Sequence, residues 1–234
     1  NTGHALSISD FERKIKLLKN NFSIISIEEL LNKKNTNNYF TISFDDGYRD
    51  NMTIAFPILE KYNIPMHIFI TSDIIEHRLL FWPDILGYIC CEIEGEYKFE
   101  FSEGIYLFDR KNRIKSYLSL CTILKEYDND QIYNIINGII KQTKFDLKIN
   151  PANIYLSRDD IKNSSHLVTF GGHSIKHENL IYLNNEDLKN TISESIGYAN
   201  ELSNSLIKTF NPKHAPCRHR TSTPIFGGFR IIVY

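Results

Sequence analysis

Short apolar runs and helical periodicities alternate along the first third of the chain. Residues 39–44 and 66–71 are rich in β-branched and aromatic side chains, which predicts two buried strands. Residues 51–62 between them have the composition of a helix, which Pro57 is expected to bend. Because helices alternate with strands in this way, the pattern predicts an α/β fold with a parallel sheet or barrel.

Two longer helices are predicted from apolar residues that recur every three or four positions. The first follows a capping box formed by Ser9 and Glu12. Its apolar face carries Phe11, Ile15 and Leu18. The second lies in NNEDLKNTISESIGYANELSNSL, after a strand predicted over residues 167–170 and ended by Gly171 and Gly172. Its apolar face carries Leu188, Ile192, Ile196, Ala199 and Leu202.

The middle of the chain breaks this alternation. Residues 76–150 include the text FWPDILGYICCEIEGEYKFEF and continue with polar, helix-like sequence. We interpret this stretch as an insertion between core elements of a single domain that spans residues 1–234.

The overall composition is that of an ordinary globular protein. Of the 234 residues, 42% are hydrophobic and 24% are charged, which is enough for a substantial core. The formal net charge of -1 provides no basic field, so we expect no nucleic-acid partner. No apolar run is long enough to span a membrane, and the first residues lack the apolar core of a signal peptide. The four cysteines favour free thiols, and both the cytoplasm and the cell envelope stay open as locations.

Two pairs of polar residues follow predicted strands. Asp45 and Asp46 end the first strand, where adjacent carboxylates repel each other unless a positive group lies nearby. His173 and His177 follow a later strand, and on one helical turn both imidazoles would point the same way. Each pair alone is more often an ordinary surface feature. Together, at strand ends that meet on one edge, they match a common ligand set for catalytic zinc and predict a metal site.

The segments that carry these pairs resemble the signature motifs of a known family. TISFDDGYRDN and FGGHSIKHENL resemble the first two motifs of the polysaccharide deacetylase family, the carbohydrate esterases with a NodB-like domain. Residues 43–47 match the motif T/S-F-D-D-G, and His173, Ser174 and His177 match the two histidines and the serine or threonine of the second motif. The similarity covers roughly residues 1–75 and 155–207.

The resemblance implies a fold, a reaction and a role for each motif residue. The fold would be a distorted (β/α) barrel, and the reaction would remove acetyl groups from an acetylated glycan or a sugar precursor. Asp46, His173 and His177 would hold a divalent metal ion, with zinc as the first choice and cobalt or another divalent ion as alternatives. Asp45 would be the general base.

Residues 211–234 depart from the family pattern. The third family motif is an arginine-proline-aromatic loop that orients the base, and its nearest counterpart here is KHAPCRHR. There Pro216 would match, while Arg218 and Arg220 lie close by. No histidine or tryptophan follows Arg220, so the late family motif with its general-acid histidine is missing. We therefore expect a divergent or truncated C-terminal end and incomplete closure of the barrel.

Other candidate side chains have simpler explanations. His67 lies within a predicted strand, so we expect a buried or rim position and not a fourth ligand. His166 is expected to face solvent. Phe81 and Trp82 would either line a sugar-binding cleft or pack in the core of the insertion, and both alternatives stay open.

These features together predict a hydrolase that cleaves the carbon–nitrogen bond of N-acetyl groups on amino sugars. Two alternatives rest on the same residues. One is an esterase that removes O-acetyl groups from carbohydrates. The other is a catalytically impaired remnant that binds a metal or a glycan.

Overall fold

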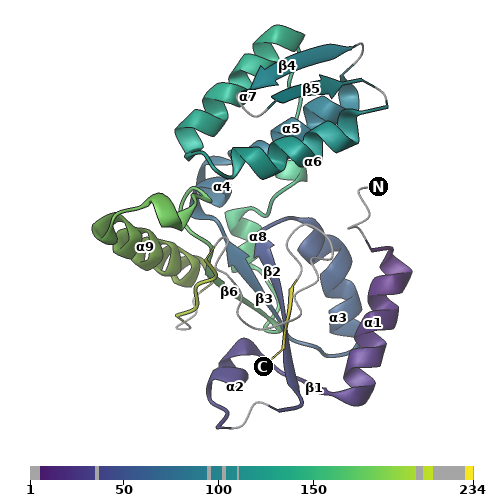
Figure 1. Ribbon diagram of the computed structural model, residues 1–234. Helices are drawn as coiled ribbons and strands as arrows, with labels where there is room; N and C mark the ends of the chain where they lie inside the picture. The colour runs from purple at the N-terminus through teal and green to yellow at the C-terminus, as the bar shows by residue number, and fades with distance from the viewer. Residues whose placement is uncertain are drawn as a thin grey trace. The chain divides into compact units, whose positions relative to one another are not determined.

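The chain forms two compact units. The computed structural model describes residues 6–34, 37–93, 96–101, 104–109, 111–203, 208–212 and 230–233. The larger unit combines Asn1–Arg78 with Pro151–Tyr234, and the smaller unit is Leu79–Asn150 (Figure 1). The chain thus leaves the larger unit after Arg78 and returns to it at Pro151.

The larger unit is built on a mainly parallel sheet. Strands β1 (Ser23–Ile24), β2 (Tyr39–Asp46), β3 (Met66–Ile70) and β6 (Val168–Gly172) follow one another in parallel, and β7 (Arg230–Val233) pairs antiparallel with β2. Asp46 is in register with Ile70, which is in register with Gly172. The carboxyl ends of β2, β3 and β6 therefore meet at one edge, and the predicted α/β fold is confirmed.

The central strands are buried, which explains their continuous apolar sequence. Parallel strands that are covered on both faces carry apolar residues at successive positions instead of alternating with polar ones. All five residues of β3 are buried, as are most of those in β2 and β6. Their side chains form the core of the larger unit together with residues from the flanking helices, including Phe11, Ile15, Phe56, Leu59, Ala199 and Leu202.

The helices of the larger unit include the three that the sequence predicted, which are α1, α3 and α9 in the following list. They are α1 (Ile8–Asn21), α2 (Ile27–Leu31), α3 (Phe56–Lys61), α4 (Ser72–His77), α8 (Arg158–Lys162) and α9 (Asn185–Ser203). A π-helical stretch (Asn51–Ala55) leads into α3, and Pro57 stands in the first turn of α3, where no backbone donor is needed. The capping residue of α1 was predicted wrongly. Ser7, and not Ser9, caps this helix by accepting a hydrogen bond from the Asp10 amide at 3.1 Å.

Helix α9 packs on β6 (Figure 1). Its buried positions are Thr191, Ser195, Ala199 and Leu202, so the buried stripe is displaced from the apolar one that the sequence predicted. Gly172 explains the displacement. A Cβ atom on this glycine would lie 2.6 Å from Ser195 Oγ and 2.9 Å from the Ile196 amide nitrogen. Close approach of helix and strand therefore requires small side chains on both.

The smaller unit has its own core. It contains α5 (Trp82–Glu92), the antiparallel pair β4 (Tyr97–Phe101) and β5 (Gly104–Phe108), α6 (Arg113–Leu124) and α7 (Asn129–Thr143). Its core includes Trp82, Leu86, Ile89, Leu120, Leu124 and Ile136. Phe81 is 2% exposed and Trp82 is 3% exposed, and Trp82 belongs to the core of the smaller unit, as one of the two alternatives predicted. Cys90, Cys91 and Cys121 are free thiols.

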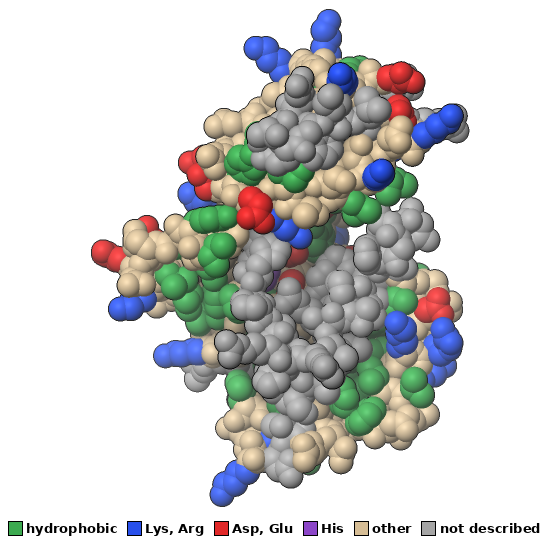
Figure 2. All heavy atoms as spheres, in the orientation of Figure 1, with side chains coloured by type: hydrophobic (Ala, Val, Ile, Leu, Met, Phe, Trp, Pro, Cys, Tyr) green, Lys and Arg blue, Asp and Glu red, His purple; other side chains and the backbone are tan. Residues whose placement is uncertain are grey.

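The outer surface carries charges of both signs. On the face shown in Figure 2, lysine and arginine side chains are interspersed with aspartate and glutamate side chains. Among the described residues, no helix combines the length and the apolar character needed to cross a membrane.

Candidate metal centre

Asp45 and Asp46 are the last two residues of β2. Asp45 is buried, with 3% of its surface exposed, whereas Asp46 is partly exposed. Neighbouring side chains on a strand point in different directions, so the two carboxylates have different surroundings. Asp46 also adopts a left-handed backbone with φ of 73°.

His173 and His177 lie in a loop after β6 and not on a helical turn, so this part of the prediction was wrong. The loop is held by the start of α4. The Ser72 amide donates a hydrogen bond to the Ser174 carbonyl at 3.3 Å, and the Asp73 amide donates to the Ile175 carbonyl at 2.9 Å. These donors are among the first amides of a helix, which have no partner within the helix itself.

Left-handed backbone conformations occur at this loop and at the end of β2, as they do at four other non-glycine positions among the described residues. Ser174 has φ of 70° and His177 has φ of 55°, in addition to Asp46. Such conformations cost non-glycine residues about 1–3 kcal/mol each and persist only where the surroundings enforce them. These three positions lie in the two segments that the sequence motifs identified.

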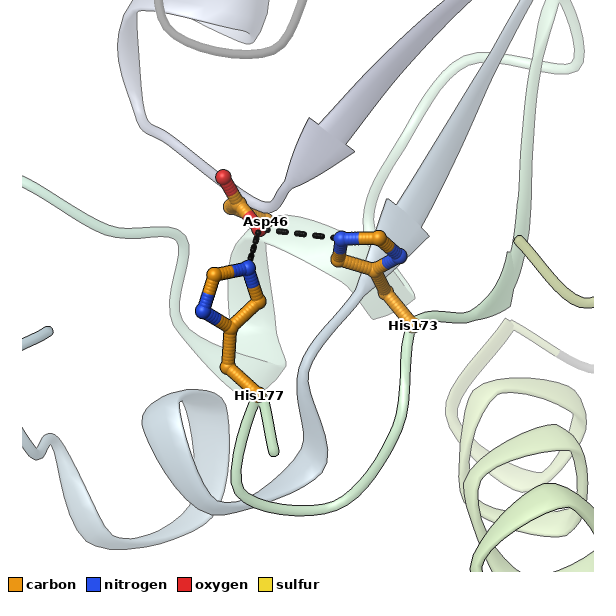
Figure 3. A group of neighbouring side chains, drawn as sticks. All are labelled: Asp46, His173 and His177. Carbon is orange, nitrogen blue, oxygen red and sulfur yellow. Dashed lines mark ion pairs between the residues drawn. The ribbon is translucent and has the colours of Figure 1, made fainter. Parts of the chain in front are cut away.

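The side chains of Asp46, His173 and His177 converge on one another (Figure 3). Asp46 Oδ1 lies 3.3 Å from His173 Nε2 and 3.2 Å from His177 Nε2. Each of the three residues offers one atom that could bind a metal ion, and these three atoms all lie within 4.8 Å of one another. The structure thus brings together the three residues that were predicted to act as metal ligands.

The carboxylate of Asp46 and the two histidine rings stabilise one another's charged forms. Burial alone would raise the pKa of Asp46, but the adjacent rings of His177 and His173 outweigh burial and hold this pKa well below its usual range. Burial alone would lower the pKa of His173, yet the carboxylates of Asp46 and Asp45 raise it overall. Asp46 is therefore ionised, as a metal ligand must be.

Asn211 is part of the site and was missed by sequence reasoning. Its side-chain amide donates a hydrogen bond to Asp45 Oδ1 at 2.6 Å. Its main-chain carbonyl lies 2.5 Å from His173 Nδ1, and because a carbonyl can only accept, Nδ1 must carry the proton. Pro212 was one signal in the sequence. A residue that precedes proline favours the extended conformation, so Asn211 could have been predicted to lie along the edge of the sheet.

The donor set fits a divalent metal ion. A neutral His173 with its proton on Nδ1 would have its lone pair on Nε2, the nitrogen that faces Asp46, and a main-chain partner on the other nitrogen is the usual support for a metal-bound histidine. Asp46 Oδ1 is buried, and among the described residues no donor is aligned to form a hydrogen bond with it. One carboxylate and two imidazoles form a three-ligand site of the kind that leaves a position open for water.

The remaining histidine predictions fall in different places. His67 is buried in β3, with 1% of its surface exposed, and is not part of the converging group. His166 is exposed, as predicted. The segment KHAPCRHR, which was the nearest counterpart of the third family motif, lies outside the described residues.

Known proteins resemble this chain in part of its sequence and in its fold. Residues 32–94, which include Asp45 and Asp46, match the family model described as polysaccharide deacetylase. No curated protein matches the chain in sequence.

Two solved structures are similar to the chain at low sequence identity. The Streptococcus pyogenes deacetylase PplD, in complex with acetate, has a TM-score of 0.50 at 12% identity, over 87% of this chain and 61% of PplD. The deacetylase domain of BpsB from Bordetella bronchiseptica has a TM-score of 0.45 at 13% identity, over 89% of this chain and 69% of that domain. The chain thus spans about three fifths of the length of PplD, with which it shares a fold.

Proposed function

Because the chain belongs to the polysaccharide deacetylase family, as its two motifs predicted, we propose that it removes N-acetyl groups from amino sugars of a glycan by metal-dependent hydrolysis. The observation that carries this proposal is the convergence of Asp46, His173 and His177 beside Asp45. The reaction would consume water and yield acetate and a free amine.

In this proposal Asp46, His173 and His177 hold the metal ion, with zinc as the first choice. A divalent ion in such a site lowers the pKa of bound water and polarises the acetyl carbonyl. The chain contributes an ionised carboxylate and two imidazoles, of which His173 is fixed in one tautomer by the Asn211 carbonyl.

Asp45 acts as the general base. Its carboxylate is buried next to the proposed ligands and is oriented by the Asn211 amide, which donates to Oδ1. From this position Asp45 would accept a proton from the water that attacks the acetyl carbonyl. A base held in place in this way typically contributes a factor of about 10²–10⁴ to the rate.

The acetate in the PplD structure is consistent with this proposal. Acetate is the acid that hydrolysis of an acetylated sugar releases. For this chain the acetyl group would have to lie against the edge of the sheet where Asp45 and Asp46 end β2.

The proposal is tested by measuring acetate release. The purified chain is loaded with zinc or cobalt and incubated with N-acetylglucosamine oligomers and, separately, with O-acetylated xylan. The decisive variant is Asp45→Asn, and the matched control is Asp159→Asn, which makes the same chemical change at an exposed position on α8.

We expect metal-dependent release from the N-acetylated substrate. Asp45→Asn should reduce the rate about 10²–10⁴-fold, while Asp159→Asn should stay within about twofold of the unmodified chain. Preference for acetylated xylan would identify an O-acetyl esterase. Tight zinc binding without any release would identify a non-catalytic metal-binding protein, and unchanged activity in Asp45→Asn would exclude this base.

A further inference from the structure

A short edge segment, residues 209–211, extends the sheet beside the end of β6. The Gly172 amide donates a hydrogen bond to the Thr209 carbonyl, and the Asn211 amide donates to the Gly172 carbonyl, each at 3.0 Å. Phe210 and Gly172 form an isolated parallel bridge. The edge segment is therefore held next to the strand that leads into His173.

His67 fixes this segment from β3. His67 Nε2 lies 2.8 Å from Thr209 Oγ1, and His67 Nδ1 lies 2.7 Å from Thr169 Oγ1. The ring thus links three neighbouring pieces of backbone, namely β3, β6 and the edge segment. A neutral imidazole has one donor and one acceptor nitrogen, and hydroxyl groups can serve either, so both contacts are satisfied at once.

Gly171 allows the edge segment to lie this close. A Cβ atom at this position would lie 2.2 Å from Thr209 Oγ1 and 2.6 Å from His67 Nε2. Only glycine leaves room for the hydrogen bond between Thr209 and His67. Thr209 and His67 are both buried, so an unpaired hydroxyl or ring nitrogen would not be compensated by solvent.

The other end of the edge segment contacts the candidate site at two points. The Asn211 side chain donates to Asp45, and the Asn211 main chain accepts from His173. A displacement of the edge segment would thus disturb both the proposed base and a proposed ligand. A substitution of the Asn211 side chain would disturb only the base.

We propose that His67 is a positioning residue, which sets Asp45 and His173 in place through Thr209 and Asn211. This inference rests on the proposed function, which gives Asp45 its role as base and His173 its role as metal ligand. The contacts that carry it do not include an ion or a substrate.

The test compares two variants, each of which removes one of the two threonine hydroxyl groups that contact the His67 ring. Thr209→Val breaks the link between His67 and the edge segment, and Thr169→Val breaks the link on the other side of the ring. Thr209→Ser keeps the hydroxyl and serves as the rescue variant. Three properties are measured: the NMR resonance of the His173 Nδ1 proton, the zinc affinity by chelator competition, and kcat and KM for acetate release.

In Thr209→Val we expect the His173 Nδ1 resonance to be lost or shifted, and zinc affinity and kcat to fall about 10–100-fold, as for other partners of metal ligands. KM should change less than about threefold. Thr169→Val and Thr209→Ser should retain the resonance and stay within about threefold in affinity and kcat, even where thermal stability falls.

An unchanged resonance in Thr209→Val would overturn the inference, as would an equal loss in Thr169→Val. The resonance needs neither zinc nor substrate. If the unmodified chain releases no acetate, the proposed function fails, while the positioning role of His67 is still decided by the resonance.

If Thr209→Val does not fold, His67→Gln and His67→Asn replace it. A glutamine amide reaches the place of Nε2 and should preserve the resonance, and an asparagine amide reaches only that of Nδ1 and should lose it.

Discussion

At the scale of residues, Asp45 and Asp46 are chemically identical neighbours that differ in what surrounds them. Asp46 faces two imidazoles that stabilise its negative charge. Asp45 is more deeply buried and accepts a hydrogen bond from a neutral amide. The two carboxylates therefore differ in their surroundings, as the two proposed roles require.

The two contacts of Asn211 can be separated by one substitution. Asn211→Ala removes the side-chain donor to Asp45 but keeps the main-chain carbonyl that accepts from His173. We predict that acetate release falls about tenfold, since mutation of supporting groups typically costs 10–100-fold, and that zinc affinity stays within about twofold. Steady-state kinetics and chelator competition measure the two effects. A parallel loss of zinc affinity would contradict this division.

Sequence reasoning could find Asp45, Asp46, His173 and His177 because each pair stands in a short local motif at a strand end. Asn211 could not be found in this way. It is a common polar residue whose role comes from contacts with Asp45 and His173, which are distant in the sequence. The third family motif consists of charged and aromatic residues, and its nearest counterpart in the sequence begins only after Asn211.

At the scale of elements, α9 can pack closely on β6 because the side chains at their contact are small. Gly172 lies against backbone atoms of Ser195 and Ile196, and the buried positions of α9 are mostly small. The amphipathic pattern correctly predicted a long helix here. It could not predict which stripe would be buried, because that depends on the shape of the strand opposite. In the same way, the spacing of the two histidines did not reveal that a strained loop carries them.

Gly172→Ala tests this packing. The new Cβ would lie 2.9 Å from backbone atoms of α9, so helix and strand must move apart, and we predict a loss of about 1–3 kcal/mol in the free energy of unfolding. Gly197→Ala is the matched control on α9, because nothing lies within 4 Å of its added Cβ. It should be neutral or stabilise the helix by up to about 1 kcal/mol. Urea unfolding compares both with the unmodified chain, and equal stability of the two variants would contradict the packing argument.

At the scale of the whole molecule, the buried His67 links stability to pH. Burial lowers its pKa from 6.5 to about 3. Below pH 6.5 the unfolded chain takes up a proton at this residue while the folded chain does not, so acid favours unfolding. The contribution of His67 is therefore complete above pH 6.5 and is lost as the pH falls towards 3, by up to about 1.4 kcal/mol per pH unit.

The comparison of the unmodified chain with His67→Gln isolates this contribution. Between pH 7 and pH 5.5 we predict that the free energy of unfolding falls by about 1 kcal/mol more in the unmodified chain than in the variant. His173 has a raised pKa and contributes with the opposite sign, but it is present in both proteins and cancels. Urea unfolding at the two pH values measures the difference. Parallel losses in the two proteins would mean that His67 titrates normally in the folded state.

The order of the segments in the chain gives the candidate site a further consequence. Asp46 precedes the smaller unit in sequence, and His173 and His177 follow it. An ion held by these residues would act as a removable cross-link between the two halves of the larger unit, closing a loop that contains the whole smaller unit. If the chain is cut within Leu79–Asn150, the two fragments should therefore dissociate less readily in the presence of zinc than in the presence of a chelator.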